Sequence, residues 1–212
     1  MARISRYISV NSYYIICEGK TEKNYFEILK QKLRISGLNI ICIVSEKKDP
    51  KSISEKAIEI LEKNKAENNY IKGDKYYCVF DLDNHRNKKL DEAKKEIIDY
   101  PEIKLILSNP SLELWFLLHF EKIEEKNLSN RRINDLLSKK INKKYSKSHI
   151  KEITKNLLIP KIKTAIKNSK KIEEELNIKD INLFSEESNP STMLHILIEE
   201  ILESNNKRRL FY

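Results

Sequence analysis

Residues 13–22 are Tyr13-Tyr14-Ile15-Ile16-Cys17-Glu18-Gly19-Lys20-Thr21-Glu22, an apolar run that stops at an acid. Apolar residues without polar alternation predict a strand over residues 12–17 that is buried on both faces. Gly19 permits a tight turn, and Thr21 is the expected N-cap of a helix over about residues 22–33. Glu18 is therefore predicted to emerge at the carboxyl edge of a sheet, where open α/β sheets build their ligand sites.

The same unit of an apolar strand and a helix recurs along the first half of the chain. Further strands are expected at 38–44, 75–80 and 103–107. One helix is expected to reach residue 64, with Ser54 or Ser52 as its N-cap. Further helices are expected at 90–98 and at 111–120, the last with Pro110 at its first position and Ser108 or Asn109 as its cap. This alternation predicts an α/β fold with a mainly parallel sheet covered by helices on both faces.

After Glu121 the sequence shows helical patterns only. Helices are expected at about 130–142, at 150–176 with a break near Pro160, and at 191–204. We therefore predict an α/β catalytic domain at 8–121, a basic α-helical region at 122–206 packed on it, and a tail at 207–212. Ser188-Asn189-Pro190-Ser191 repeats the tetrapeptide at 108–111, which we interpret as one helix-capping solution used twice.

Acidic residues stand where two of the predicted strands end. The strand at 75–80 runs into Asp81-Leu82-Asp83, and two acids two residues apart face the same way in an extended chain, where they repel unless a cation lies between them. Glu22 lies near enough to share a site with Glu18, although it could merely complement a helix N-terminus. Glu113 points either to the polar edge of its helix or into the site. Converging carboxylates predict a hard, oxygen-rich pocket suited to Mg²⁺, with Mn²⁺ as a substitute.

Composition and cysteine usage limit the class of protein. The chain has 212 residues, 40% hydrophobic and 34% charged, with no apolar run of eighteen residues and no apolar segment after the basic start, so neither a membrane span nor a secretory signal is expected. Cys17, Cys42 and Cys78 lie in apolar runs and are expected to be buried free thiols of a reducing compartment. The expected location is the cytoplasm.

Positive charge is concentrated in one part of the chain. Residues 126–171 hold 15 Lys and Arg against 2 acids, a net of +13, while the whole chain carries +9, so the remainder is −4. Such asymmetry favours a nucleic-acid backbone as partner. The predicted contacts are Lys139, Lys140, Lys143, Lys144 and Lys147. The alternative is a solvated, lysine-rich helical surface.

Other catalytic classes fit less well. No Ser/His/Asp arrangement stands out, and Gly19-Lys20-Thr21 lacks the earlier glycine of a phosphate-binding P-loop. A phosphatase of the haloacid dehalogenase kind could use Asp81 and Asp83, but that fold needs a later strand ending in an acidic pair, and no such strand is expected after residue 120.

Four motifs resemble those of RloB-like proteins, which carry a Toprim-type domain. Residues 17–26 resemble the family's CEGxTExxYF signature, 79–83 its DxD strand, 108–120 its NPxxExWxLLHF element and 189–192 its C-terminal NPST. Their order and spacing fit across most of the chain. The resemblance implies a Toprim-like fold in which Glu18, Asp81 and Asp83 hold Mg²⁺, with Glu22 and Glu113 as additional catalytic acids.

The resemblance also implies a role. Proteins of this kind, including an abortive-infection member, are encoded beside an ATPase with an ABC-type or AAA-type head and act in defence against phage. The expectation is a nuclease that cleaves phosphodiester bonds with that ATPase as partner, and DNA and RNA both stay open as substrates. A homo-oligomer is compatible with the sequence. The alternative from a different class is a non-catalytic subunit that binds nucleic acid or the ATPase.

Overall fold

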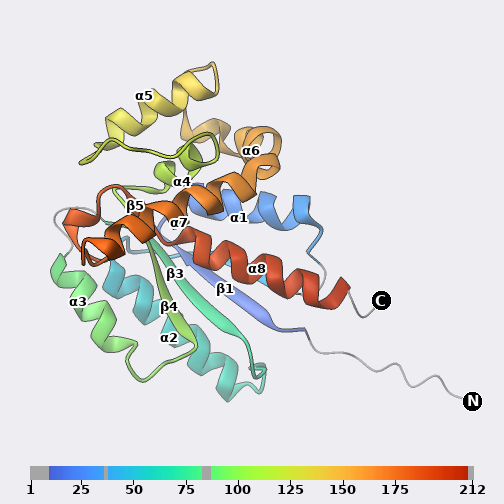
Figure 1. The fold of residues 1–212 in the computed structure, drawn as a ribbon. Helices are drawn as coiled ribbons and strands as arrows, with labels where there is room; N and C mark the ends of the chain where they lie inside the picture. Colours follow the sequence, from blue (N-terminus) through green and yellow to red (C-terminus); the bar gives the residue numbers. More distant parts are fainter. Residues whose placement is uncertain (1–9, 36–37, 83–86, 210–212) are drawn as a thin grey trace, which may run out of the picture.

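A five-stranded sheet forms the centre of the protein (Figure 1). The computed structural model describes residues 10–35, 38–82 and 87–209. The strands are β1 (Ser12–Cys17), β2 (Asn39–Val44), β3 (Lys75–Asp81), β4 (Ile103–Asn109) and β5 (Ser191–Thr192). Their order in the sheet is β2-β1-β3-β4-β5, with β1 to β4 parallel and β5 antiparallel to β4. The prediction of an α/β fold with a mostly parallel sheet is confirmed.

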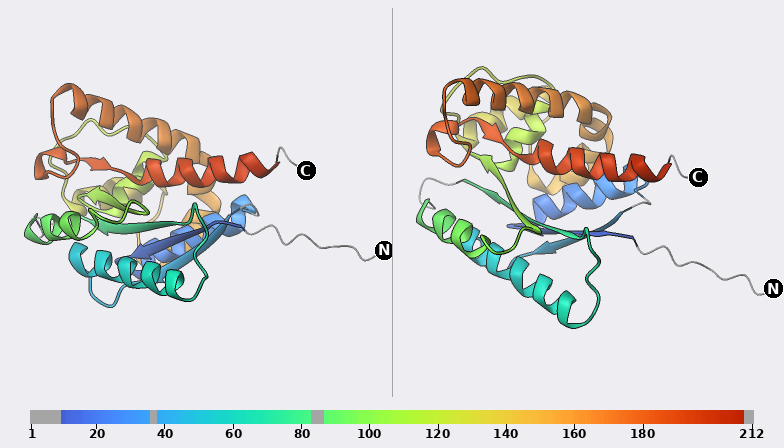
Figure 2. Two further views of the ribbon diagram at one scale, coloured as in Figure 1. Left: turned by 90° about the horizontal axis from the view of Figure 1, so that it is seen from below. Right: turned by 60° about the horizontal axis from the view of Figure 1, so that its bottom comes forward.

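Helices cover both faces of this sheet (Figures 1 and 2). The α-helices are α1 (Lys20–Leu33), α2 (Pro50–Ala66), α3 (Asn87–Glu96), α4 (Leu112–Leu118), α5 (Asn130–Lys140), α6 (Ile150–Ile153), α7 (Ile162–Ile178) and α8 (Leu194–Arg209). Helices α2 and α3 lie on one face, and α1, α4, α7 and α8 lie on the other, with α5 and α6 beyond them. Each face has its own hydrophobic cluster, as expected for strands that are apolar on both sides.

The two central strands bring the predicted acids together. β1 pairs with β3 in a register that sets Cys17 beside Val79. The N–H of Glu18 continues the ladder by donating to the carbonyl of Val79 at 3.1 Å. Because parallel strands end at the same edge, residue 18 and residue 81 leave the sheet side by side.

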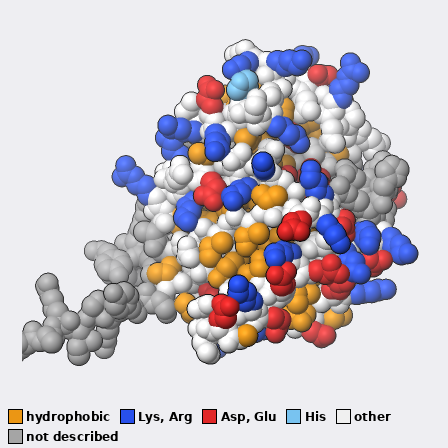
Figure 3. Space-filling model, turned by 180° about the vertical axis from the view of Figure 1, so that it is seen from behind, with side chains coloured by type: hydrophobic (Ala, Val, Ile, Leu, Met, Phe, Trp, Pro, Cys, Tyr) orange, Lys and Arg blue, Asp and Glu red, His pale blue; other side chains and the backbone are white. Residues whose placement is uncertain are grey.

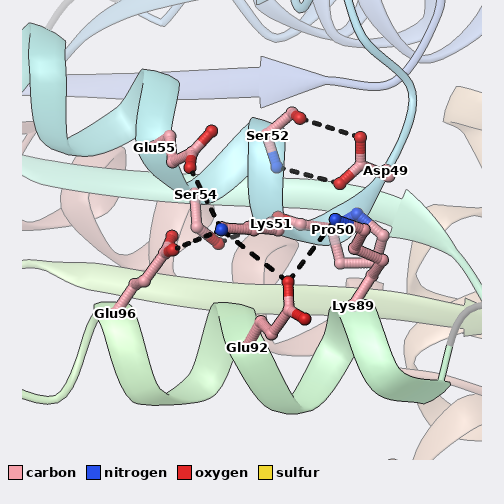
Figure 4. Close-up of polar contacts among 9 residues, drawn as sticks. All are labelled: Asp49, Pro50, Lys51, Ser52, Ser54, Glu55, Lys89, Glu92 and Glu96. Carbon is pink, nitrogen blue, oxygen red and sulfur yellow. Dashed lines mark hydrogen bonds and ion pairs between the residues drawn. The ribbon is translucent and has the colours of Figure 1, made fainter.

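Polar contacts tie α2 to α3 on the opposite face (Figure 4). The Lys51 ammonium lies 3.8 Å from Glu92 and 3.5 Å from Glu96 of α3. Asp49 caps α2, because its Oδ1 accepts the N–H of Ser52 at 3.2 Å and Pro50 takes the first helical position. The prediction that Ser52 or Ser54 is the N-cap was therefore wrong.

Two other helix starts differ from the prediction. Helix α1 begins at Lys20 with Gly19 as the residue before it, so Thr21 is inside the helix. Helix α4 begins at Leu112 after Ser111, so Pro110 does not open it. The reason is that β4 continues through Asn109, which leaves Pro110 in the connection.

The repeated tetrapeptides pair with each other. The sequence predicted that only helices follow Glu121. That prediction was wrong, because β5 is a strand in this part of the chain. Ser108 lies opposite Thr192, and their hydroxyls are 2.8 Å apart. Both tetrapeptides contain a cis Asn-Pro bond, and the amide of Asn109 donates to Ser188 Oγ at 2.9 Å. Helix α8 therefore starts at Leu194 rather than at 191, and the repeat serves strand pairing instead of helix capping.

The C-terminal helices share the core of the α/β part. One hydrophobic cluster contains Ile15 and Trp115 as well as Leu137, Ile172 and Leu197. Between α6 and α7 the helix passes through a π-helical segment (Thr154–Leu158) and a 3₁₀ turn (Ile159–Lys161), which contains Pro160, the predicted break. Further 3₁₀ turns lie at Lys147–His149 and Glu186–Ser188. The proposed domain boundaries stay a prediction.

Two expectations from composition can be compared with the structure. Cys17, Cys42 and Cys78 are free and buried, as predicted. Within the described ranges, none of the helices has the length and apolar character that crossing a bilayer requires.

Candidate metal centre

Glu18 and Asp81 meet at the carboxyl edge of the sheet. The backbone N–H of Asp81 donates to Oε2 of Glu18 at 3.2 Å. Oδ1 of Asp81 in turn accepts the N–H of Leu112, the first residue of α4, at 2.9 Å. One carboxylate is thus oriented by the end of β3 and the other by the start of α4, which fixes both at the point where β1 and β3 end.

Glu22 and Glu113 add two buried carboxylates to this pair. Glu22 lies in the first turn of α1 and is 6% exposed, and Glu113 lies in the first turn of α4 and is 3% exposed. Oε2 of Glu22 is buried and has no hydrogen-bond partner among the described residues. A Cβ placed on Gly19 would stand 3.0 Å from this oxygen, so the glycine leaves room for the carboxylate.

The electrostatics show that these acids share one site. Burial raises the pKa of Asp81 well above its usual value, and the charges of Glu22, Glu18 and Glu113 raise it further. Burial, followed by the charges of Glu18 and Glu113, also raises the pKa of Glu22. Asp81 and Glu22 are thus harder to ionise because they are buried and lie close to other negative charges.

A loop from the C-terminal helical region reaches into the cluster. We call residues 142–149 the basic loop. The hydroxyl of Tyr145 donates to Oε1 of Glu113 at 3.1 Å, and the ammonium of Lys147 lies 3.2 Å from the same oxygen. Burial acts to lower the pKa of Lys147, but the negative charges of Glu113, Asp81 and Glu22 outweigh it, so this pKa is raised. The basic loop therefore supplies a positive charge to the acidic site.

The side chains present fit a hard divalent cation. Carboxylate oxygens are the ligands that Mg²⁺ and Mn²⁺ prefer, and the unpartnered oxygen of Glu22 is a free donor of that type. Glu18, Glu22, Asp81 and Glu113 come together as the sequence suggests. Asp83, the third predicted ligand, lies outside the described residues. In the part of the chain that the structure describes, no three His, Cys, Asp or Glu side chains already form a group that could hold a metal ion.

The five lysines predicted to bind nucleic acid fall into two groups. Lys147 belongs to the acidic site, and Lys140 lies 2.5 Å from Glu121. Lys139, Lys143 and Lys144 are exposed and make no ion pair with any described residue. Lys and Arg side chains gather over the upper part of the molecule in Figure 3, where α5 and α6 lie in Figure 1. The basic segment of the sequence thus contributes to this basic surface, and one of its lysines, Lys147, contacts the carboxylate cluster.

The buried histidines belong to the core. Nδ1 of His119 contacts the carbonyl of Trp115 at 2.8 Å, and burial lowers the pKa of His119 to about 4. His195 contacts Ser169 through Nδ1 at 2.9 Å and Glu173 through Nε2 at 2.9 Å. Because Ser169 is 2% exposed, this serine is packed between helices rather than presented to a substrate.

Tyr145 is the site residue that sequence reasoning missed. It is an aromatic residue within the run Lys143-Lys144-Tyr145-Ser146-Lys147, and its side chain is 8% exposed. An apolar ring in an otherwise charged run is a signal of burial, which could have identified it. Its partner could not be found from the sequence, because Glu113 is 32 residues away.

Fold and site together define an α/β protein that has a carboxylate cluster at the carboxyl edge of its sheet, with a basic loop from the C-terminal helices laid across it. The model of the RloB-like protein family matches residues 13–201, which include the whole cluster and the basic loop. The chain belongs to the RloB-like protein family. Searches of curated proteins and of solved structures give no match.

Proposed function

We propose that this protein is a Mg²⁺-dependent, Toprim-like nuclease that cleaves phosphodiester bonds of nucleic acid as the effector of an ATPase-coupled antiphage system. The observation that carries the proposal is the convergence of Glu18, Glu22, Asp81 and Glu113. Burial and the charges of the neighbouring acids raise the pKa of Asp81 and of Glu22, and a bound cation would offset this repulsion. A basic surface beside such a cluster suits a polyanionic substrate. The order β2-β1-β3-β4 with acids after β1 and β3 supports a Toprim-like arrangement.

In this proposal the acids and the lysines have different roles. Glu18, Asp81 and Asp83 would hold the ion, with Mn²⁺ as an alternative, and the bound ion would neutralise the phosphodiester and activate water. Glu22 and Glu113 add negative charge that favours the cation and can accept a proton from the attacking water. Lys147 would offer its ammonium to the phosphate, and Lys139, Lys143 and Lys144 would contact the backbone further along the strand.

Cleavage by the purified protein tests the proposal directly. Full-length protein is incubated with labelled DNA and RNA in Mg²⁺ or Mn²⁺, alone and together with the proposed ATPase partner. The double change Asp81→Ala/Asp83→Ala should abolish cleavage, whereas Glu174→Gln, a change at an exposed position of α7, should leave it intact. Equal cleavage by the double variant would refute the assignment of the acids.

Metal binding can be tested without activity. Mg²⁺ should raise the melting temperature of the wild type in a concentration-dependent manner, since a ligand at about 100 times its Kd stabilises the folded state by about 2.7 kcal/mol. Asp81→Asn should lose this response. An identical Mg²⁺ response in both proteins would place the ion elsewhere.

The cellular role needs two separate measurements. Co-purification with an ATPase, should an adjacent gene encode one, tests the partner. Sequencing of RNA and DNA ends after induced expression distinguishes an RNase from a DNase, and new ends in neither nucleic acid would contradict the nuclease proposal.

A further inference from the structure

A cavity of about 220 Å³ opens between the end of α5 and the π-helical segment after α6. Its lining combines apolar side chains with hydrogen-bonding and basic ones. Ile141, Ile153 and Leu157 contribute the apolar part, and Lys143, Lys144 and Asn156 contribute exposed polar groups. The cavity is smaller than most cofactor sites, so it suits one planar ring system rather than a whole dinucleotide.

The backbone explains why these groups surround one space. Helix α5 ends at Lys140 and is followed by Ile141 and by a left-handed residue, Asn142, with φ 52°. The N–H of Lys143 donates back to the carbonyl of Ser138 at 3.1 Å. This turn sends Lys143 and Lys144 across the cavity. On the other side, Ile153, Asn156 and Leu157 are three and four residues apart and so share one helix face.

One lining side chain has an unused hydrogen-bonding atom. Nδ1 of His149 is buried and has no hydrogen-bond partner among the described residues. Glu152 also lines the cavity, so it offers an acceptor beside the amide of Asn156. An apolar lining with donors and acceptors at its rim matches a nucleobase, which has apolar faces and a polar edge. A bare phosphate would gain nothing from the apolar lining.

The basic loop connects this cavity to the candidate metal centre. Lys144 lines the cavity, and the next residue, Tyr145, donates to Glu113 in the acidic cluster. Its backbone N–H is fixed by Ser138 Oγ at 2.8 Å. Only three peptide units, about 11 Å of chain at most, separate Lys144 from Lys147. A nucleotide held in the cavity would therefore lie beside the basic loop that borders the carboxylates.

We propose that this cavity binds one unpaired nucleobase of the substrate strand, with Lys143 and Lys144 on the adjacent phosphate. The inference rests on the proposed function and deepens it, since it assigns the substrate to nucleic acids that expose an unpaired base. A base inside a duplex could not enter the cavity without leaving its stack.

Small probes test the cavity apart from catalysis. The full-length protein is titrated, with NMR detection, with nucleoside 5′-monophosphates, ribose 5-phosphate and inorganic phosphate. The nucleotides should bind at least about fivefold more tightly than ribose 5-phosphate, because stacking of one base is worth about that factor or more. Equal binding of the three probes, or binding of none of them, would overturn the proposal.

Two variants locate the binding. Asn156→Trp should fill the cavity and remove the preference for the base, while Lys155→Trp, at a neighbouring exposed position that does not line the cavity, should keep it. Thermal melting verifies that both fold. Lys143→Gln/Lys144→Gln changes exposed side chains only, and it should weaken the nucleotide and ribose 5-phosphate alike. Loss of the base preference in Lys155→Trp as well as Asn156→Trp would refute the assignment to this cavity.

The outcome is separable from that of the nuclease assay. Cleavage of nucleic acid without a base preference in the titration would refute the cavity and leave the proposed function intact. A base preference without cleavage would support the cavity and contradict the nuclease.

Discussion

Replacing Glu22 with glutamine is expected to stabilise the protein at neutral pH. The carboxylate is 6% exposed, its Oε2 has no hydrogen-bond partner among the described residues, and burial and the charges of Glu18 and Glu113 raise its pKa. A buried polar atom without a partner costs about 1–3 kcal/mol, and a charged one costs more. The glutamine amide is still a buried polar group, but it carries no charge and so is not repelled by Glu18 and Glu113. We therefore expect the free energy of unfolding to rise by about 1–2 kcal/mol.

The assay is thermal and urea unfolding of both proteins without divalent cations. For a chain of this size 1 kcal/mol corresponds to roughly 2–4 °C, so the melting temperature should rise by about 2–8 °C. Glu174→Gln, which makes the same change at an exposed position, should shift it by much less.

The pH dependence gives a second, stricter test. A carboxyl group whose pKa is raised in the folded state holds its proton where the unfolded chain has lost it, so it destabilises the folded state as pH rises from 4.5 through the raised pKa. The difference between Glu22→Gln and the wild type should be full above the raised pKa and should vanish below 4.5. If Glu22→Gln is less stable than the wild type at pH 7, or if the difference between them does not change with pH, the reasoning is refuted: the ionised Glu22 carboxylate would then not destabilise the folded protein.

Three further outcomes are expected. Tyr145→Phe should lower the free energy of unfolding by about 1.5–3 kcal/mol in urea denaturation, because it removes a hydrogen bond to the buried Glu113 carboxylate. Tyr14→Phe, the same change at a half-buried position, should have a smaller effect, and an unchanged midpoint for Tyr145→Phe would argue against the contact. Lys143→Gln/Lys144→Gln should reduce the slope of log K against log salt for nucleic-acid binding by about 0.7–0.9 per lost phosphate contact, and an unaltered slope would leave these lysines as solvated surface. Burial lowers the pKa of His119 from 6.5 to about 4, so the folded protein keeps this histidine neutral where the unfolded chain already protonates it. The free energy of unfolding should therefore be highest above pH 6.5 and should fall as the pH drops towards 4. The wild type should therefore lose up to about 3 kcal/mol over this window relative to His119→Gln, and parallel pH profiles in urea titrations would contradict it.

Local patterns were sufficient to predict most of the sheet. β1, β2, β3 and β4 are continuous apolar runs between turn residues, and their alternation with amphipathic helices leaves few arrangements other than a parallel sheet. The helix starts were less predictable, since Asp49, Ser52 and Ser54 can all cap, and the choice depends on Pro50. β5 has two residues and no apolar pattern, so only its pairing with Ser108 and Asn109 defines it.

The candidate site was predictable to the extent that it depends on strand ends. Glu18 and Asp81 follow from the rule that parallel strands end at one edge, and Glu22 follows from its position one helical turn later. The contacts of Glu113 could not be derived in the same way, because they depend on how α4 packs against a loop 32 residues away. Long-range packing of this kind has no local signature in a single sequence.

The basic loop gives the C-terminal helices a direct part in the site. Glu113 is 3% exposed, and an ionised carboxylate at that depth needs a compensating charge or strong donors. Tyr145 and Lys147 supply both, and the fold holds them there through Ser138, whose Oγ accepts the N–H of Tyr145 and donates to the carbonyl of Asn134. A cation bound among the carboxylates would compete with Lys147 for Glu113, since both neutralise the same charge. The side chain of Lys147 is 63% exposed, so its ammonium would then be available to a phosphate. We therefore expect the basic loop to lie against Glu113 when Lys147 neutralises the acidic cluster, and to move away from it when a bound cation does so.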